Sequence, residues 1–342
     1  MNDLDYDKSL TSHVEDIAAG DHVVAAAFLE GAPAFALANG EIVFAAGNNR
    51  RIAVHPDAAI LVTASDSRLI VTGGDDGRIF LTSAAGTTQE VANEGGKWID
   101  AIALREDGAI AWSVAKQVRA RDAKGVVKSF EAPSSVRGLA FMPKGYRVAM
   151  AHYNGLSLWF PNIVGEPETL KWAGSHLDVI ISRDGQFAVS SMQENSLHGW
   201  RISDKKDMRM TGYPSKTRSF SWSSDGEWLA TSGADACVVW PFHSKDGPMG
   251  KAPKECGVRA PKVTQVAFHP KSPALAVGYE DGWILLCRLA DSAELLVRRT
   301  PDGTPTTGRK RAAISALVWD SDGKRLLFGA ENGDAGMLTL PV

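Results

Sequence analysis

Residues 218–240 read RSFSW (218–222), SSDG (223–226), EWLATS (227–232), GAD (233–235) and ACVVW (236–240). The three apolar segments alternate with period 2 and are short, which indicates β-strands. The two segments between them contain Gly beside Asp or Ala, which suits the positive φ angles of tight hairpin turns. This stretch therefore predicts a small antiparallel meander of three strands joined by two tight turns.

The same pattern recurs along the chain with a period of about 40 residues, the range in which propeller blades fall. The first strands of the eight units fall at Val23–Phe28, Ile60–Thr63, Ile99–Leu104, Leu139–Phe141, Leu177–Ile181, Arg218–Trp222, Val266–Phe268 and Leu317–Trp319. One meander cannot bury both of its faces alone, whereas a ring of them packs face to face. We therefore expect an all-β, single-domain β-propeller over residues 1–342 with eight four-stranded antiparallel blades. Seven blades are the alternative, because the first two units are short and can be read as one irregular blade.

The last unit stops at Pro341–Val342, after its third strand. We expect its fourth strand to come from the N-terminal segment 1–20, around Leu10–Ile17, because that pairing would close the ring and cover two sheet edges. No window of 12 or more residues shows helical periodicity, which argues against a helix bundle or a Rossmann domain.

Two stretches carry a family resemblance. Ser232–Asp235 followed by Val238–Trp240, and the similar Thr72–Gly77, resemble the third-strand signature of WD40-repeat propellers. The chain is thus similar to that family, as a divergent bacterial member. It departs from the family pattern because none of the third-strand tryptophans is followed by Asp, and the Gly-His start is only approximated at Gly174–His176. The polar tetrad that the resemblance would supply is therefore expected to be largely missing.

Composition excludes several classes of protein. Lys and Arg number 37 against 40 Asp and Glu, a formal charge of -3, so no overall basic field favours nucleic acid. The apolar stretch Val23–Gly47 is interrupted by charged and turn residues, so no membrane span or signal peptide is expected. Three cysteines do not make a disulfide framework, which favours the cytoplasm. We expect a cytoplasmic monomer that binds neither membranes nor nucleic acids.

In the arrangement that the resemblance implies, the turns after the second strand of each blade and the connections between blades form one face, the top face. Aromatic residues beside carboxylates on these loops have the composition of a protein-binding surface. The alternative is that Asn and Asp serve turn geometry and that the tryptophans pack between blades. The candidate partner-binding residues are Trp98, Tyr153, Trp172, His176, Glu194, Asp235, Tyr279 and Glu280.

The chain has none of the usual catalytic or phosphate-binding motifs, so we expect a non-enzymatic scaffold for a protein or peptide partner, without a cofactor. Two alternatives remain: a metal-binding accessory protein, and a small-molecule enzyme with its site at the channel mouth. The basic run Arg309–Arg311, within the loop Thr300–Arg311, is either a solvated loop or a segment that docks an acidic partner. The candidate metal ligands are His243, Cys256, His269 and Cys287.

Overall fold

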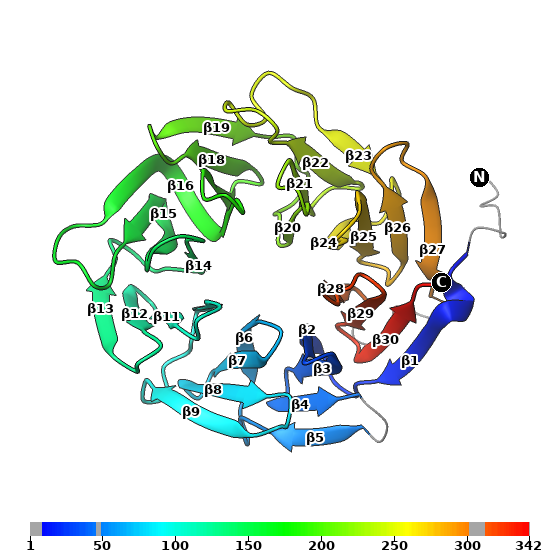
Figure 1. Cartoon of the computed structure of the whole chain (residues 1–342), viewed down its shortest axis with the longest axis horizontal. Helices are drawn as coiled ribbons and strands as arrows, with labels where there is room; N and C mark the ends of the chain where they lie inside the picture. The colour runs from blue at the N-terminus through cyan, green and yellow to red at the C-terminus, as the bar shows by residue number, and fades with distance from the viewer. Residues whose placement is uncertain (1–8, 46–48, 301–311, 342) are drawn as a thin grey trace.

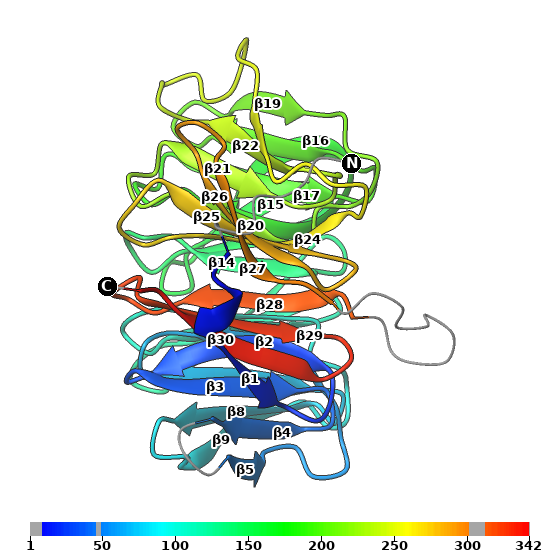
Figure 2. The same cartoon turned by 90° about the vertical axis from the view of Figure 1, so that its right-hand side faces the viewer.

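The computed structural model describes residues 9–45, 49–300 and 312–341. The basic run Arg309–Arg311 lies outside these residues. The strands are arranged as a ring around a central axis (Figure 1), and the side view shows a disc in which the sheets lie one beside the next (Figure 2). One short 3₁₀ helix, η2 (Thr11–His13), precedes the first strand.

Six sheets of the described chain contain four antiparallel strands each, and in five of them the strands follow one another in chain order. The first is β2 (Val23–Leu29), β3 (Ala32–Leu37), β4 (Glu41–Phe44) and β5 (Arg50–Ala53). The second is β6 (Ile60–Ser65), β7 (Leu69–Gly74), β8 (Arg78–Ser83) and β9 (Thr88–Asn93). The third is β10 (Ala101–Leu104), β11 (Ile110–Val114), β12 (Gln117–Arg121) and β13 (Val127–Glu131).

The remaining three four-stranded sheets belong to the C-terminal half of the ring. One is β20 (Phe220–Trp222), β21 (Trp228–Thr231), β22 (Cys237–Pro241) and β23 (Lys254–Cys256). The next is β24 (Val263–Phe268), β25 (Ala274–Tyr279), β26 (Ile284–Arg288) and β27 (Glu294–Arg298). The last combines β28 (Ile314–Trp319), β29 (Arg325–Ala330) and β30 (Asp334–Thr339) with β1 (Val14–Ala18). Because β1 pairs with β30 from Val14 opposite Leu338 to Ala18 opposite Asp334, an N-terminal strand closes the ring.

The sequence units beginning at residues 139 and 177 share one sheet of six strands. Its members are β14 (Gly138–Phe141), β15 (Val148–Trp159), β16 (Glu168–Ile181), β17 (Phe187–Met192), β18 (Leu197–Arg201) and β19 (Lys206–Met210). The first half of β16 pairs with β15 and its second half with β17, so no loop separates the two units.

The prediction of eight separate blades is therefore wrong: the described strands form seven continuous sheets, the number given as the alternative. Counting each continuous sheet as one blade, the ring has seven blades, one of which is double. The physical reason is the continuity of β16, which carries hydrogen bonds from one sequence unit into the next. The merged units are the two joined by β16, not the first two of the chain, which form separate sheets.

β15 turns back on itself within its labelled range. Asn154 and Gly155 both have positive φ, 68° and 140°. The side chains of His152 and Ser157 are hydrogen-bonded, with 2.8 Å between Nε2 and Oγ, which an extended run of five residues, about 16 Å long, would not allow. The Asn154–Gly155 pair therefore forms a hairpin turn, as the sequence pattern predicts.

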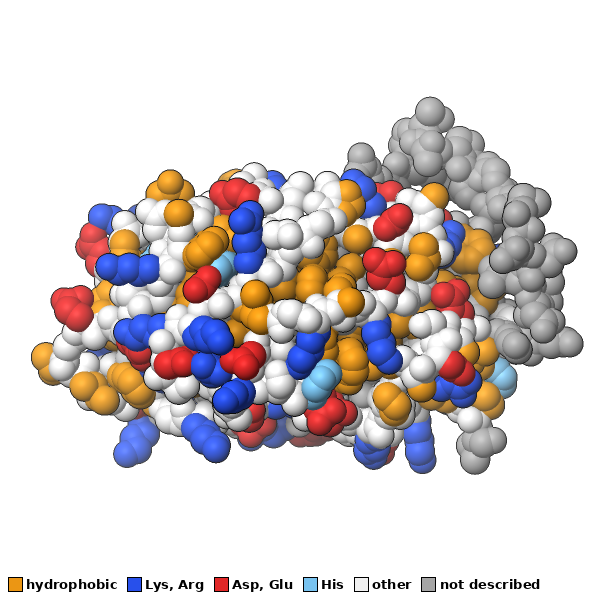
Figure 3. Space-filling model, turned by 90° about the horizontal axis from the view of Figure 1, so that it is seen from above, with side chains coloured by type: hydrophobic (Ala, Val, Ile, Leu, Met, Phe, Trp, Pro, Cys, Tyr) orange, Lys and Arg blue, Asp and Glu red, His pale blue; other side chains and the backbone are white. Residues whose placement is uncertain are grey.

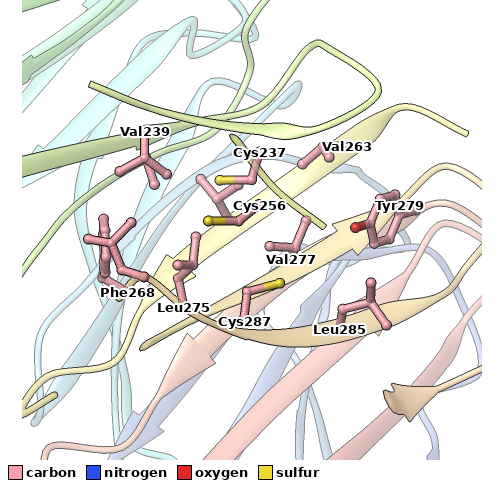
Figure 4. Close-up of a cluster of buried hydrophobic side chains, with 13 residues drawn as sticks. Cys237, Val239, Cys256, Val263, Phe268, Leu275, Val277, Tyr279, Leu285 and Cys287 are labelled. Atoms are coloured by element: carbon pink, nitrogen blue, oxygen red, sulfur yellow. The ribbon is translucent and has the colours of Figure 1, made fainter. Parts of the chain in front are cut away.

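Buried apolar side chains fill the spaces between neighbouring sheets. Between β22 and the sheet of β24–β27, for example, Val239, Leu275 and Val277 lie with the buried cysteines in one cluster (Figure 4). The two halves of the six-stranded sheet also pack against each other, through Leu156 on one side and Trp200 on the other. Face-to-face packing of apolar surfaces is thus continuous around the ring, and it provides the main stabilising contribution to the fold.

The tight turns depend on residues that tolerate positive φ. Gly40, between β3 and β4, has φ 87°, and a Cβ atom there would lie 2.2 Å from the carbonyl oxygen of His55. Its own carbonyl accepts hydrogen bonds from the amides of Val54 and His55. Gly40 therefore ties the hairpin turn to the chain that leaves the same sheet.

The edge of the disc carries mixed charge. In the view of Figure 3, Lys and Arg side chains alternate with Asp and Glu side chains, and hydrophobic side chains lie between them. Within the described ranges no helix has both the length and the apolar character needed to cross a bilayer.

Candidate functional site

Two of the cavities lined by described residues open on the top face, which is formed by the turns after second strands and by the connections between sheets. The first lies at the end of the central channel, has a volume of about 1110 Å³ and includes turn residues Asn195, Glu280 and Glu331. The second has a volume of about 720 Å³ and includes turn residues Tyr153 and Asn154. We call them the channel mouth and the Tyr153 groove.

The channel mouth brings together residues from connections that enter the innermost strands. Lys216 and Arg218 precede β20, and Lys262 precedes β24. The acidic side chains of Glu280, Asp281 and Glu331 line the same cavity. Of the predicted partner-binding residues, Glu280 lies here, and its Oε1 accepts a hydrogen bond from the amide of Lys262 at 3.2 Å.

The Tyr153 groove contains two of the predicted aromatic residues. Tyr153 is 58% exposed and lies in the hairpin turn of β15, while Trp172 comes from the first half of β16. Pro133 and Ser134, in the connection between β13 and β14, complete one side. The backbone amide of Tyr153 donates to Ser134 Oγ at 2.8 Å, which fixes the turn against the neighbouring sheet. The groove therefore offers two aromatic rings on a well-supported backbone.

Trp172 is held in place by histidines behind it. Its ring stacks on His198 with 3.9 Å between centroids and 16° between planes. Its carbonyl oxygen accepts a hydrogen bond from His176 Nε2 at 3.1 Å, and His176 Nδ1 lies 2.7 Å from Ser190 Oγ. An aromatic ring fixed in this way loses little conformational entropy on binding a ligand.

His198 has an unusual environment. It is fully buried, and neither ring nitrogen forms a hydrogen bond within the described part of the chain. Its Nε2 lies 3.6 Å from Asp207 Oδ2, a contact too long for a hydrogen bond. Burial, together with the positive fields of His176 and Arg209, lowers the pKa of His198 to about 3. The ring is therefore neutral at neutral pH, which suits its contact with the face of Trp172.

In three sheets, a buried polar network connects the second strand of a sequence unit to the chain that enters or begins that unit. His176 with Ser190 is one. In the second, His55 lies 2.9 Å from Thr72 Oγ1 and 3.1 Å from Asp76 Oδ2.

In the third network, Trp240 Nε1 donates to the Tyr213 hydroxyl at 2.6 Å, and that hydroxyl lies 2.7 Å from Thr231 Oγ1. The polar tetrad was expected to be largely missing, but these three sheets each contain a buried polar network in a comparable place. The third-strand Asp is absent, but histidine or tyrosine still connects the segments.

The other predicted partner-binding residues do not gather at one place. Tyr279 is 0% exposed, and its hydroxyl donates to the carbonyl oxygen of Gly257; His176 is also buried, so neither side chain is exposed on the top face. Trp98 is 64% exposed but lines neither cavity. Glu194 accepts a hydrogen bond from the Ser175 amide, and Asp235 is exposed in its turn.

The four candidate metal ligands lie in different surroundings. Cys256 and Cys287 lie with Cys237 in a buried apolar cluster (Figure 4), and burial raises the pKa of all three thiols. His269 Nε2 lies 2.8 Å from the carbonyl oxygen of Gly323, and His243 is exposed. Among the described residues, no three His, Cys, Asp or Glu side chains are grouped in a way that could hold a metal ion.

Sequence reasoning missed four residues of the two sites. Lys216, Arg218 and Lys262 each stand a few residues before a first strand, a repeated position that could have identified them. His198, which lies behind the groove, shows no signal in the sequence, because a histidine in a third strand can face either side of its sheet.

Comparison with known proteins identifies one repeat and the overall fold. Residues 206–240 match the family model described as "WD domain, G-beta repeat", which spans β19 of one sheet and β20–β22 of the next. The chain is also similar to the computationally designed Ika8 protein, known from a crystal structure. That likeness has a TM-score of 0.75 and 18% sequence identity, and it covers 96% of this chain and 98% of that chain. At 18% identity, this likeness shows the fold alone. No curated protein matches the sequence.

Proposed function

The chain is a β-propeller that carries a WD40 repeat, and from this premise we propose that it is a non-enzymatic scaffold that binds a protein or peptide partner on its top face. WD40 propellers typically act as protein-interaction scaffolds. Binding on the face formed by turns is consistent with a rigid ring, because turns can vary while the sheets keep their packing.

The observation that carries this proposal is the position of Tyr153 and Trp172 in one groove. Tyrosine and tryptophan are the residues most often responsible for binding energy at protein interfaces. Here both line a cavity of about 720 Å³ that also contains Pro133 and Lys171. Stacking of Trp172 on His198 holds one ring in place before any partner arrives. The groove would accept an apolar or aromatic side chain of the partner.

A peptide-binding experiment tests the proposal. Peptides selected by wild-type protein from a displayed random library should be titrated against the variants Tyr153→Ala and Trp172→Phe by calorimetry. Loss of the Tyr153 ring should weaken binding by about 2 kcal/mol, roughly 30-fold in Kd. Trp172→Phe keeps an aromatic ring over His198 and should weaken binding less.

Trp98→Ala is the matched control, because it removes an equally exposed aromatic residue that lines neither cavity. Its Kd should stay within twofold of wild type. Selected peptides whose affinity is reduced by Trp98→Ala and not by Tyr153→Ala would show that the partner binds elsewhere. Thermal unfolding of each variant verifies that the ring is intact.

A further inference from the structure

Three cationic side chains line one wall of the channel mouth. Lys216 and Arg218 lie in the connection to β20, and Lys262 lies in the connection to β24. The innermost strands β20 and β24 of neighbouring sheets lie side by side near the centre of the ring (Figure 1). In the described ranges, no ion pair or side-chain hydrogen bond is formed by the ammonium groups of Lys216 and Lys262 or by the guanidinium group of Arg218. We call these three residues the basic wall.

The backbone under the basic wall is held firmly. The amide of Arg218 donates to Ser232 Oγ at 3.2 Å, and the carbonyl oxygen of Lys262 accepts from the amide of Glu280 at 2.9 Å. Ser215, just before Lys216, donates from its Oγ to the carbonyl oxygen of Gly233 at 2.7 Å. The backbone positions from which the three side chains extend are therefore fixed, while none of their charged ends is paired with another described residue.

The acidic groups at the same mouth offset the basic wall only in part, because Glu280 and Glu331 bring two negative charges against three positive ones. Asp281 is engaged by Arg259 through two contacts of 2.9 and 3.2 Å. Glu280 accepts the hydrogen bond from the Lys262 amide. Glu331 lies on the β29–β30 turn, which belongs to the last sheet of the ring and not to the two that carry the wall. Like charges in a concave site produce a positive local potential, which an anionic ligand would relieve.

The size and lining of the cavity select among anionic ligands. Its volume of about 1110 Å³ is far larger than a single small ion needs. Apolar side chains such as Val24, Ile60 and Ile314 share the lining with the cations, and none of the Phe, Tyr and Trp residues that the structure describes lines it. Nucleic-acid sites normally provide aromatic rings on which bases stack. A peptide chain with several carboxylates fits both the positive wall and the apolar remainder.

We propose that the basic wall of the channel mouth binds a carboxylate-rich peptide segment. This goes beyond the proposed docking in the Tyr153 groove, and it rests on that function only in assigning the acidic segment to the same partner. Each carboxylate would accept charge-assisted hydrogen bonds from a lysine ammonium or from the arginine guanidinium. Glu331, on the last sheet, would direct the acidic segment toward the basic wall by repulsion.

Fluorescence anisotropy with fluorescein-labelled hexaglutamate tests this directly. The triple variant Lys216→Gln, Arg218→Gln, Lys262→Gln should bind at least tenfold more weakly than wild type. Raising NaCl should weaken wild-type binding steeply, and the triple variant should show a shallower dependence. Lys262→Gln alone should also weaken hexaglutamate binding, by a smaller factor. This single variant tests the proposal if the triple variant does not fold.

The chain offers a matched control in Lys124, Lys128 and Lys144, three exposed cations that line neither cavity. Replacement of these three lysines by Gln removes the same charge and should leave hexaglutamate binding within twofold. A greater loss in this control than in the basic-wall variant would overturn the proposal, as would absence of binding by wild type at 1 mM protein.

Two competitors and one surface variant complete the experiment. Inorganic phosphate or a twelve-residue oligothymidylate that displaces hexaglutamate at equal or lower concentration would overturn the assignment to a peptide. Trp98→Ala, at an exposed residue that lines neither cavity, should leave hexaglutamate binding unchanged. Hexaglutamate reports on the basic wall and the library-selected peptides report on the Tyr153 groove, so failure of one site to bind is distinguished from failure of the other.

Discussion

The six-stranded sheet and the packed layer between β22 and β26 both combine aromatic residues with histidine or cysteine, yet they do so at different depths. In the six-stranded sheet, Trp172 stacks on buried His198 and lines the same groove as the exposed Tyr153. In the second, Tyr279 is enclosed with three cysteines in an apolar cluster. The same residue types therefore form a supported surface in one sheet and interior packing in the other. What differs is the position of the side chain: Tyr153 projects outward from a hairpin turn, whereas Tyr279 ends β25 and lies under the connection through Gly257 that enters its sheet.

The largest expected effect separates the two tyrosines. Tyr279→Ala removes a fully buried ring and should lower the free energy of unfolding by about 3–5 kcal/mol, while Tyr153→Ala should change it by less than about 0.5 kcal/mol. Urea denaturation at neutral pH measures both. If Tyr279→Ala does not fold, Tyr279→Phe, which loses only the hydrogen bond to Gly257, should cost about 1–2 kcal/mol. Equal losses at the two positions would remove the contrast between the regions.

The next effect concerns His198. Its pKa is lowered from 6.5 to about 3 in the folded protein, so the fold favours the neutral ring. Below about pH 6.5 the unfolded chain binds a proton at this histidine and the folded chain does not, so the free energy of unfolding falls as the pH falls from 6.5 toward 3. Between pH 7 and pH 5 this one histidine should cost about 2 kcal/mol of unfolding free energy.

His198→Phe keeps the stacking partner of Trp172 and removes the titrating group. Its free energy of unfolding should therefore fall less between pH 7 and pH 5 than that of wild type. A residual fall is expected, because burial also lowers the pKa of His55, His152 and His176. Identical pH dependences of variant and wild type would show that His198 is not the titrating group.

A smaller effect of opposite sign is expected at Asp178 in β16. Burial raises the pKa of this carboxyl from 3.8 to about 6, against the hydrogen bond that it accepts from the Val179 amide. Stability that is present below about pH 3.8 is therefore lost as the pH rises through 6. Asp178→Asn should stabilise the protein by about 1–2 kcal/mol at pH 7 and leave it unchanged near pH 4. Thermal unfolding at the two pH values measures this, and destabilisation at pH 7 would contradict the account.

The smallest effect is expected from thiol chemistry in the cysteine layer. Cys237, Cys256 and Cys287 are buried with raised pKa values, so little thiolate is available to react. Native protein at pH 8 should react with a disulfide reagent such as DTNB at fewer than one in ten thiols in the time that urea-unfolded protein takes to react completely. Rapid labelling of one cysteine in the native protein would show that this layer opens to solvent.

Much of the fold and part of the site were predictable from local pattern. Alternating apolar runs and Gly-containing turns identify the meanders, and Gly40 and Asn154 show why: the turns require positive φ. The same turns place Tyr153 on the surface, and Trp172 lies in the groove beside it. The burial of Tyr279 was not predicted, although it stands three residues before the turn glycine Gly282, as buried His152 does before Gly155, whereas Tyr153 stands two residues before that glycine. The connection through Gly257, which covers it, comes from the preceding sheet.

The amino-acid sequence by itself determined that this chain forms antiparallel meanders repeated around a ring, because strand alternation and turn conformation are local properties of a few consecutive residues. Only the tertiary structure decided that β16 joins two units into one sheet, that Trp172 rests on His198, and that the three cations of the basic wall come together at the channel mouth. Each of these depends on contacts between segments that are distant in the chain or on the absence of a loop break. Local pattern does not specify such contacts, since they are set by how neighbouring sheets pack.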